Sequence, residues 1–433
     1  ERALALSTAR ETMVIVTASA VANLRWARTT LTTNGETTAT AVTVIALVDV
    51  PGGTGVGSVS RSNPGLEGLG ALVAEAETVA RASEAAEDAA DLVVDVVDAA
   101  WDDVPGATDA GSVGVLAAGL GEVFRGAVAD GIEHFGYAEQ SVVTTYLGTS
   151  RGVRRRWEQP TGRLELTAKS HARSRSTWAG RAARDLSSLD LAAVDAELRR
   201  GLAWQERRVE VAPGRHPAIL TPSAVSDLMI DLYWSSAGRD AAEGRSVWSS
   251  PGGGTRLGEQ VGRSGLTLSS DPRDAELACE PFVATATSSA EASVFDNGLT
   301  LAPTTWIEDG RLDSLLATRH AAAEHGLPVR PFVDNLRLEV AGGTGSLDDL
   351  VARTERGLLV TCLWYNRVVD PQTLLLTGLT RDGVYLVEGG EVVGAVGNYR
   401  FNDSPVALLS RVCDASATAP TLAREMGDYF NRA

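Results

Sequence analysis

The stretch NLRLEVAGGTGSLDDLVARTERGLLVTCLWYNRVVDPQTLLLTGLTRDGVYLVEGGEVVGA, residues 335–395, carries the clearest structural pattern of the chain. Apolar and polar residues alternate over residues 336–340, which predicts a strand because successive strand side chains point to opposite faces. A glycine turn follows, and Ser346 and Asp349 have the spacing of a capping box, which predicts the start of a short helix. The beginning of the stretch therefore predicts the order strand, turn, helix.

Turn residues divide the rest of this stretch into further strands. Gly357 precedes an apolar run, and the Asp370-Pro371 pair predicts the next turn. Gly389 and Gly390 separate two apolar segments, as in a hairpin with a two-residue turn. This part of the chain is therefore expected to be rich in strands.

Composition limits the classes of protein to consider. The 433 residues exceed what one hydrophobic core usually organises, and 44% hydrophobic with 22% charged residues is typical of a soluble protein, so no membrane span is expected. A net charge of -17 argues against general nucleic-acid binding. Three widely spaced cysteines indicate neither a disulfide framework nor a CxxC zinc site, and the opening ERALALSTAR lacks a secretory pattern. We therefore expect a cytoplasmic protein.

The N-terminal part is expected to mix helices and strands. Strand-like runs within residues 14–48 meet at Asn34-Gly35, the strongest hairpin signal there, and an Ala- and Glu-rich stretch over residues 66–100 has helical spacing. Residues 102–112, rich in Pro, Gly and Asp, are typical of a linker. Three units are predicted, at residues 1–105, 106–208 and 209–433.

The second and third units begin with recognisable helices. A helix is expected near residues 113–129, and a charged helix over 191–207 closes the second unit after several strands. In the third unit Thr221 and Pro222 are typical of an N-cap and a first helical residue. The predicted fold class is α+β, with N-terminal α+β domains followed by a strand-rich C-terminal domain.

The pattern of residues 335–395 resembles the C-terminal domain of the TldD/TldE (PmbA) family of peptidase subunits. A weaker similarity extends to the first unit, around Arg25-Trp26-Ala27 and the helix that follows. In this family the TldD-type subunit is a zinc metallopeptidase, whose signature is a His-Glu-x-x-x-His helix with a distant cysteine. Two imidazoles on one helix face and a thiolate leave a fourth zinc position for the water to be activated.

The corresponding helix here departs from that signature. It reads TPSAVSDLMIDLYWSSAGRD and has no histidine, and the motif occurs nowhere else in the chain. Cys413 stands where the family's ligand cysteine is expected, but one ligand of three cannot hold a catalytic zinc. The departure resembles the TldE type, which implies that this chain has no catalytic residue, metal or cofactor of its own and that a TldD-like partner supplies the zinc. The implied assembly is a heterodimer or larger, acts on unfolded or leader peptides, and involves neither nucleic acid nor membrane.

Asp227 and Asp231 are the candidate cleft-helix residues. Their i, i+4 spacing suits a hard cation or acid-base chemistry, while a solvated helix face, opposite a buried apolar stripe, is the favoured interpretation. Cys413 is either a vestigial ligand or, as we favour, a small buried residue.

Other short motifs are interpreted as structural. Residues 148–152, GTSRG, match the letters of a nucleophile elbow but no helix is expected after the serine. His320 and His325 are five residues apart, so on a helix they point away from each other, and solvated histidines are expected. Four arginines are expected to form a solvated or internally paired face, namely Arg151, Arg154, Arg155 and Arg156.

Three functions follow from these observations. The first is a non-catalytic TldE-like subunit of a zinc peptidase complex. The second is an autonomous hydrolase whose unrecognised site uses Asp227, Asp231 and Cys413. The third is a homodimeric peptide-binding scaffold without a peptidase partner.

Overall fold

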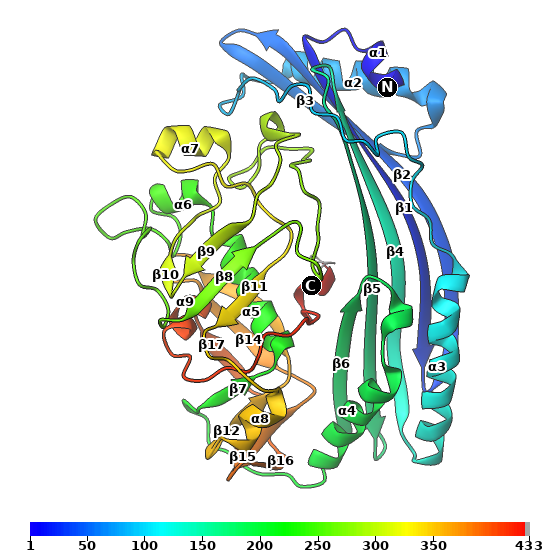
Figure 1. Ribbon diagram of the computed structural model, residues 1–433, viewed down its shortest axis with the longest axis vertical. Helices are drawn as coiled ribbons and strands as arrows, with labels where there is room; N and C mark the ends of the chain where they lie inside the picture. The colour runs from blue at the N-terminus through cyan, green and yellow to red at the C-terminus, as the bar shows by residue number, and fades with distance from the viewer. Residues whose placement is uncertain (429–433) are drawn as a thin grey trace.

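The computed structural model describes residues 1–428 and shows an α+β protein with two halves, as Figure 1 shows. One half is a sheet of six long antiparallel strands in the order β3-β2-β1-β4-β5-β6. The strands are β1 (Glu11–Ala27), β2 (Thr30–Val50), β3 (Gly53–Ser62), β4 (Glu133–Thr149), β5 (Arg154–Ser170) and β6 (Arg175–Ala183). Since β1 pairs with both β2 and β4, the strands on either side of residue 105 belong to one sheet.

The hairpin between β1 and β2 turns at a different place from the predicted one. Arg28 and Thr29 form the turn, with φ angles of 51° and 60°, whereas Asn34 and Gly35 lie inside β2 and Gly35 pairs with Asn23. The prediction at Asn34-Gly35 is therefore wrong. A local turn preference is smaller than the energy of the cross-strand pairs that a shifted register would break.

Four helices accompany the large sheet: α1 (Arg2–Leu6), α2 (Gly65–Ala82), α3 (Ala110–Ala129) and α4 (Leu191–Trp204). Helix α2 packs on β2 and β3 near one end of the sheet, where Leu72 belongs to the same buried cluster as Val14 and Val44. Helices α3 and α4 pack near the other end, around Leu24 and Leu164. The helix predicted over residues 66–100 ends at Ala82. The chain then continues in turns and isolated bridges, first beside β3 at Gly55 and then beside β5 at Arg154.

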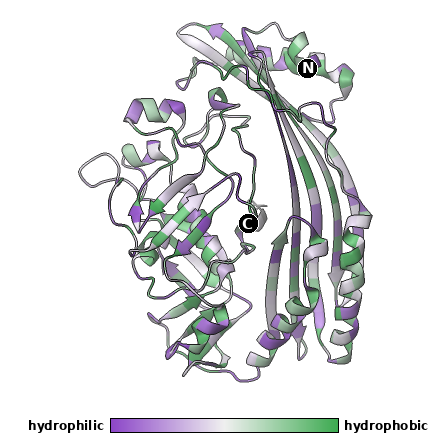
Figure 2. Ribbon diagram, viewed as in Figure 1, coloured by the Kyte–Doolittle hydropathy of each residue, from purple (hydrophilic) through white to green (hydrophobic). Residues whose placement is uncertain are grey.

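Helix α3 is long and apolar enough to cross a membrane on length and composition alone, which contradicts the expectation that no stretch reaches this limit. Figure 2 colours much of α3 as hydrophobic. One face of the helix packs on the sheet through Leu116 and Leu120, each at most 2% exposed. In this structure α3 is thus a helix that covers a sheet.

The second half contains three smaller sheets around one large core. Their strand orders are β10-β9-β8-β11, β16-β15-β12-β7 and β13-β14-β17. The strands are β7 (Ala218–Leu220), β8 (Leu266–Ser270), β9 (Thr304–Glu308), β10 (Arg311–Leu312), β11 (Arg337–Val340), β12 (Arg356–Val360), β13 (Leu363–Asp370), β14 (Leu375–Thr380), β15 (Val384–Glu388), β16 (Glu391–Ala395) and β17 (Arg400–Asp403). The helices are α5 (Pro222–Trp234), α6 (Gly238–Ala242), α7 (Arg319–His325), α8 (Leu347–Ala352) and α9 (Pro405–Leu409).

Several local predictions for this half are confirmed. Ser346 and Asp349 form both hydrogen bonds of the capping box that opens α8. Gly389 and Gly390 have positive φ angles in the turn between β15 and β16. Near the end of the described residues, Met426–Asp428 form a single 3-10 turn.

The two halves meet on the face of the large sheet opposite its helices. Met13 and Ile15 of β1 pack there against Phe282 and Phe295 of the second half. Farther along, Trp178 of β6 packs against Cys362 and Leu422. The segment of residues 421–428, dark red in Figure 1, therefore lies between the halves.

Candidate functional site

Helix α5 begins as the sequence predicts and lies inside the core of the second half. The side chain of Thr221 caps it by accepting a hydrogen bond from the backbone N–H of Ala224, and Pro222 occupies the first turn. Its apolar residues Leu228 and Leu232 belong to the cluster shared with the surrounding sheets. The helix is buried on nearly all sides, so it has no solvated face.

Asp227 and Asp231 are therefore buried, with exposed fractions of 0% and 7%, and the expectation of a solvated pair is wrong. Burial raises the pKa of each carboxyl to about 7, and the nearby Glu425 carboxylate adds to both shifts. The pattern of residues within α5 does not reveal this burial, because residues far away in the sequence cover that face.

The covering residues belong to the 421–428 segment. Asp227 Oδ1 accepts hydrogen bonds from the backbone N–H groups of Glu425, at 3.1 Å, and Met426, at 3.2 Å. The Glu425 carboxylate in turn contacts Arg367 Nη1 at 2.7 Å and the backbone N–H of Asn366 at 2.7 Å. Sequence analysis missed Glu425 and Arg367, since no local motif marks either residue.

Three carboxylates thus lie together with one arginine beside them. Asp227 Oδ2 and Asp231 Oδ2 are buried and have no hydrogen-bond partner within residues 1–428. A carboxyl with a pKa near 7 exchanges its proton at neutral pH, which suits acid-base chemistry. The pair can therefore hold or release a proton, provided that solvent or a substrate reaches it.

The residues present do not fit the family's zinc site. Helix α5 offers carboxylates instead of imidazoles, and Cys413 is exposed, which corrects the interpretation of that residue as buried. Within the described part of the chain no three His, Cys, Asp or Glu side chains are placed to hold one metal ion. The structure does not bring Cys413 and the aspartates together as a ligand set.

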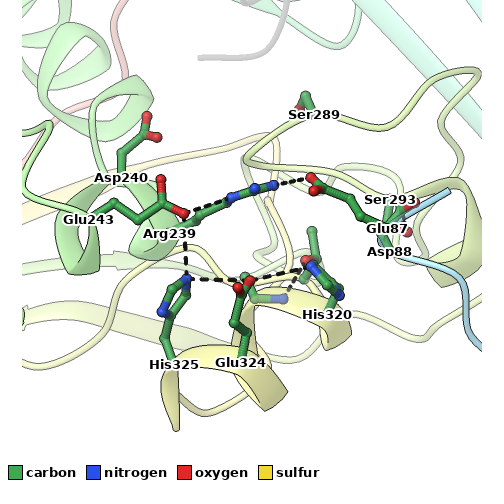
Figure 3. Close-up of polar contacts among 12 residues, drawn as sticks. Glu87, Asp88, Arg239, Asp240, Glu243, Ser289, Ser293, His320, Glu324 and His325 are labelled. Atoms are coloured by element: carbon green, nitrogen blue, oxygen red, sulfur yellow. Dashed lines mark hydrogen bonds and ion pairs between the residues drawn. The ribbon is translucent and has the colours of Figure 1, made fainter.

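The two histidines of α7 take part in a chain of ion pairs, which Figure 3 shows. His320 Nε2 lies 3.3 Å and His325 Nε2 lies 3.6 Å from the same oxygen of Glu324. Arg239 of α6 pairs with Glu243 and, at 2.5 Å, with Glu87 of the first half. Both histidines are partly buried beside acids, so the expectation that they are simply solvated is wrong.

The remaining motifs are structural, as predicted. Ser150 lies in the turn between β4 and β5 and its hydroxyl donates to Glu11, and a strand follows instead of a helix. Each arginine of the basic cluster has an acidic partner within the chain. The pairs are Arg151–Glu11, Arg154–Glu1, Arg155–Asp98 and Arg156–Glu158.

Comparison with known proteins identifies the family. Residues 213–423, which include α5 and the strands around it, match the family model of the PmbA/TldA metallopeptidase C-terminal domain. This half of the chain therefore belongs to the TldD/TldE (PmbA) family. No curated protein matches the sequence of this family member.

Solved structures with the same fold cover almost the whole chain. TldE from Thermococcus kodakarensis superposes with a TM-score of 0.76 at 17% identity, over 96% of this chain and 93% of that one. A proposed modulator of DNA gyrase from Thermotoga maritima gives 0.73 at 16% identity, over 95% and 92%. Another, from Bacteroides thetaiotaomicron, gives 0.73 at 15% identity, over 96% and 91%. At these identities the likeness establishes the fold of this TldD/TldE family member.

Proposed function

We propose that this chain is the non-catalytic, TldE/PmbA-like subunit of a TldD/TldE-type zinc metallopeptidase complex that processes or degrades peptides. The observation that carries the proposal is helix α5, which presents Asp227 and Asp231 and has no histidine. Imidazole and thiolate ligands are what a catalytic zinc of this type requires. Two buried carboxylates, of which Asp227 already accepts hydrogen bonds from backbone N–H groups, do not replace them.

In this proposal a TldD-like partner supplies the zinc and the residues that cleave the peptide bond. The present chain contributes part of the substrate path in a heterodimer or larger assembly. An extended peptide can add to the exposed edge of a sheet through backbone hydrogen bonds, and β3 and β6 are the edge strands of the large sheet. The three cysteines are free thiols, which agrees with a reducing compartment such as the cytoplasm.

The test combines this chain with the TldD-type protein of the same genome. The expected result is that the chain alone cleaves no unfolded or leader peptide, and that the mixture cleaves it faster than the TldD-type protein alone. Light scattering is expected to show a mixed complex. Cleavage by the chain alone that a chelator abolishes would overturn the proposal, as would a self-dimer that ignores the partner.

The buried aspartates favour one alternative, an autonomous hydrolase. Their pKa values of about 7 are those that a general acid or base needs at neutral pH. In that case Asp231→Asn abolishes a cleavage activity of the isolated chain while its fold is kept. Under the subunit proposal the same variant retains the ability to stimulate the partner.

A further inference from the structure

The 421–428 segment contacts the rest of the protein in the manner of a bound peptide. Residues 412–423 form no helix or strand, and only a 3-10 turn follows at Met426–Asp428. Side chains of α5 hold its backbone: Ser223 Oγ donates to the carbonyl of Leu422 at 2.8 Å, and Asp227 accepts from two N–H groups. Because these contacts involve only the backbone of the segment, its side chains can enter neighbouring pockets.

The side chain of Arg424 occupies one such pocket. Its guanidinium lies over the ring of Trp178 at 4.8 Å and over the ring of Trp364 at 5.3 Å, both within the range of a cation–π contact. Nη2 pairs with Asp382 at 2.6 Å, and Nη1 donates to Cys362 Sγ at 2.8 Å. The Arg424 side chain is only 9% exposed.

This pocket is built from both halves of the protein. Trp178 belongs to β6 of the large sheet, while Trp364 is the second residue of β13 in the second half. Two aromatic faces and one carboxylate form a site that recognises a planar cation, since guanidinium stacks on rings and pairs with carboxylates. The chemistry of the pocket therefore suits a guanidinium group.

The segment leaves several polar atoms of its surroundings without a partner in the described chain. Asp227 Oδ2, Asp231 Oδ2 and both side-chain polar atoms of Asn366 are buried and unpaired there. A buried polar group without a hydrogen bond is unfavourable, because it has lost its hydration without a replacement partner. The 421–428 segment thus satisfies this groove incompletely, which limits how tightly it is held.

We propose that the groove formed by Trp178, Ser223, Asp227, Trp364 and Asp382 is a binding site for an arginine-bearing peptide, and that residues 422–426 fill it in cis. The guanidinium of the peptide enters the pocket between the two tryptophans, and its backbone takes the contacts to α5. The chain's own segment must leave for that peptide to bind. Binding of the peptide in this groove needs the isolated chain alone and no catalytic partner.

The first experiment measures binding of a labelled peptide TLAREMG, the sequence of residues 421–427, and of its control TLAAEMG. Arg424→Ala vacates the pocket, and Arg330→Glu is a control at an exposed arginine. The Arg424→Ala chain is expected to bind TLAREMG at least about tenfold more tightly than TLAAEMG, because only the first provides the cation–π and ion-pair contacts. Wild type and the control variant are expected to bind TLAREMG about tenfold more weakly than Arg424→Ala does, since the segment in cis competes at a high effective concentration.

The second experiment uses wild type, so it decides the matter even if Arg424→Ala does not fold. Hydrogen exchange at the amides of Glu425 and Met426, which donate to Asp227, is measured with and without excess TLAREMG. Displacement by the peptide is expected to accelerate exchange at both amides, and TLAAEMG is expected to have less effect. Equal effects of the two peptides, or unchanged exchange with no binding, would mean that the segment is only a structural anchor and would overturn the proposal.

Discussion

Two groups of charged residues in this protein differ in how their charges are balanced. Around α5, Asp227, Asp231 and Glu425 lie together with Arg367 as the cation that contacts Glu425. Around α6 and α7, in contrast, acids and bases alternate along a chain of ion pairs, from Glu87 through Arg239 to the histidines (Figure 3). Burial, more than the number of charges, determines what each cluster contributes to stability.

The physical reason is the dielectric surroundings of each group. A buried carboxylate loses its hydration and, without a cation, prefers to be protonated, whereas exposed ion pairs are screened by water and contribute little. We therefore expect substitutions near α5 to have large effects that depend on pH. Substitutions in the α6–α7 cluster are expected to have small effects that depend on salt.

The largest expected effect is that of Asp227→Asn on the pH dependence of stability. The pKa of Asp227 is raised by burial from 3.8 to about 7 in the folded protein, so the folded state binds more protons than the unfolded state between these values. Protonation of Asp227 therefore contributes fully to the free energy of unfolding below about pH 4, and this contribution is lost as the pH rises to about 7. Asp227→Asn keeps an oxygen for the backbone N–H groups of the 421–428 segment and removes this loss.

Urea unfolding of wild type and Asp227→Asn from pH 4 to pH 9 measures the difference. The variant is expected to be more stable above pH 7, by up to about 4 kcal/mol, and to lose that advantage near pH 4. Asp91→Asn, at an exposed aspartate, is the matched control and is expected to change nothing. A gap between wild type and Asp227→Asn that does not vary with pH would show that Asp227 is ionised throughout.

An intermediate effect is expected from Arg367→Ala, which removes the cation that contacts Glu425. The Glu425 side chain is 11% exposed and Arg367 is 62% exposed, so the pair is buried on one side only. We expect a loss of about 1–2 kcal/mol at pH 7, between the values for exposed and buried pairs. Thermal unfolding checks this result, with Arg400→Ala as a control at an exposed arginine without a carboxylate partner in the described residues. Equal losses of stability in Arg367→Ala and Arg400→Ala would show that the ion pair with Glu425 does not cause the loss.

The smallest effect is expected from Glu324→Gln in the second cluster. The substitution removes the acid that both His320 and His325 approach. Because the Glu324 side chain is 47% exposed, we expect a loss of about 0.5 kcal/mol at low ionic strength that disappears in 1 M salt. Unfolding of wild type and variant at the two salt concentrations measures it. A loss of more than about 2 kcal/mol in the free energy of unfolding would show that this cluster behaves like the buried one around α5.

Features that depend on neighbouring residues were predictable from the sequence. The start of α5 at Thr221-Pro222 and the capping box of α8 each involve atoms within three residues of one another. The same holds for the turn at Gly389-Gly390. The resemblance to the TldD/TldE family also rested on such local signs, and it is confirmed.

Features that depend on distant residues were not predictable. The Asn34-Gly35 pair has the strongest local turn preference in its region, yet the pairing of whole strands places the turn at Arg28-Thr29. Asp227 is a polar residue at an ordinary helical position, and nothing beside it in the chain indicates that it is buried. The interpretation of such residues as solvated follows the usual behaviour of carboxylates.

The sequence by itself determined the family, the α+β class and the absence of histidine from α5. Only the tertiary structure decided that Asp227 and Asp231 are buried, that Glu425 lies beside them and that Arg424 contacts the rings of two tryptophans. The reason is that hydrogen-bonded turns and caps are formed by adjacent backbone groups. Burial and pKa, in contrast, are set by residues such as Glu425, which lies 198 positions from Asp227 in the chain and contacts it in the fold.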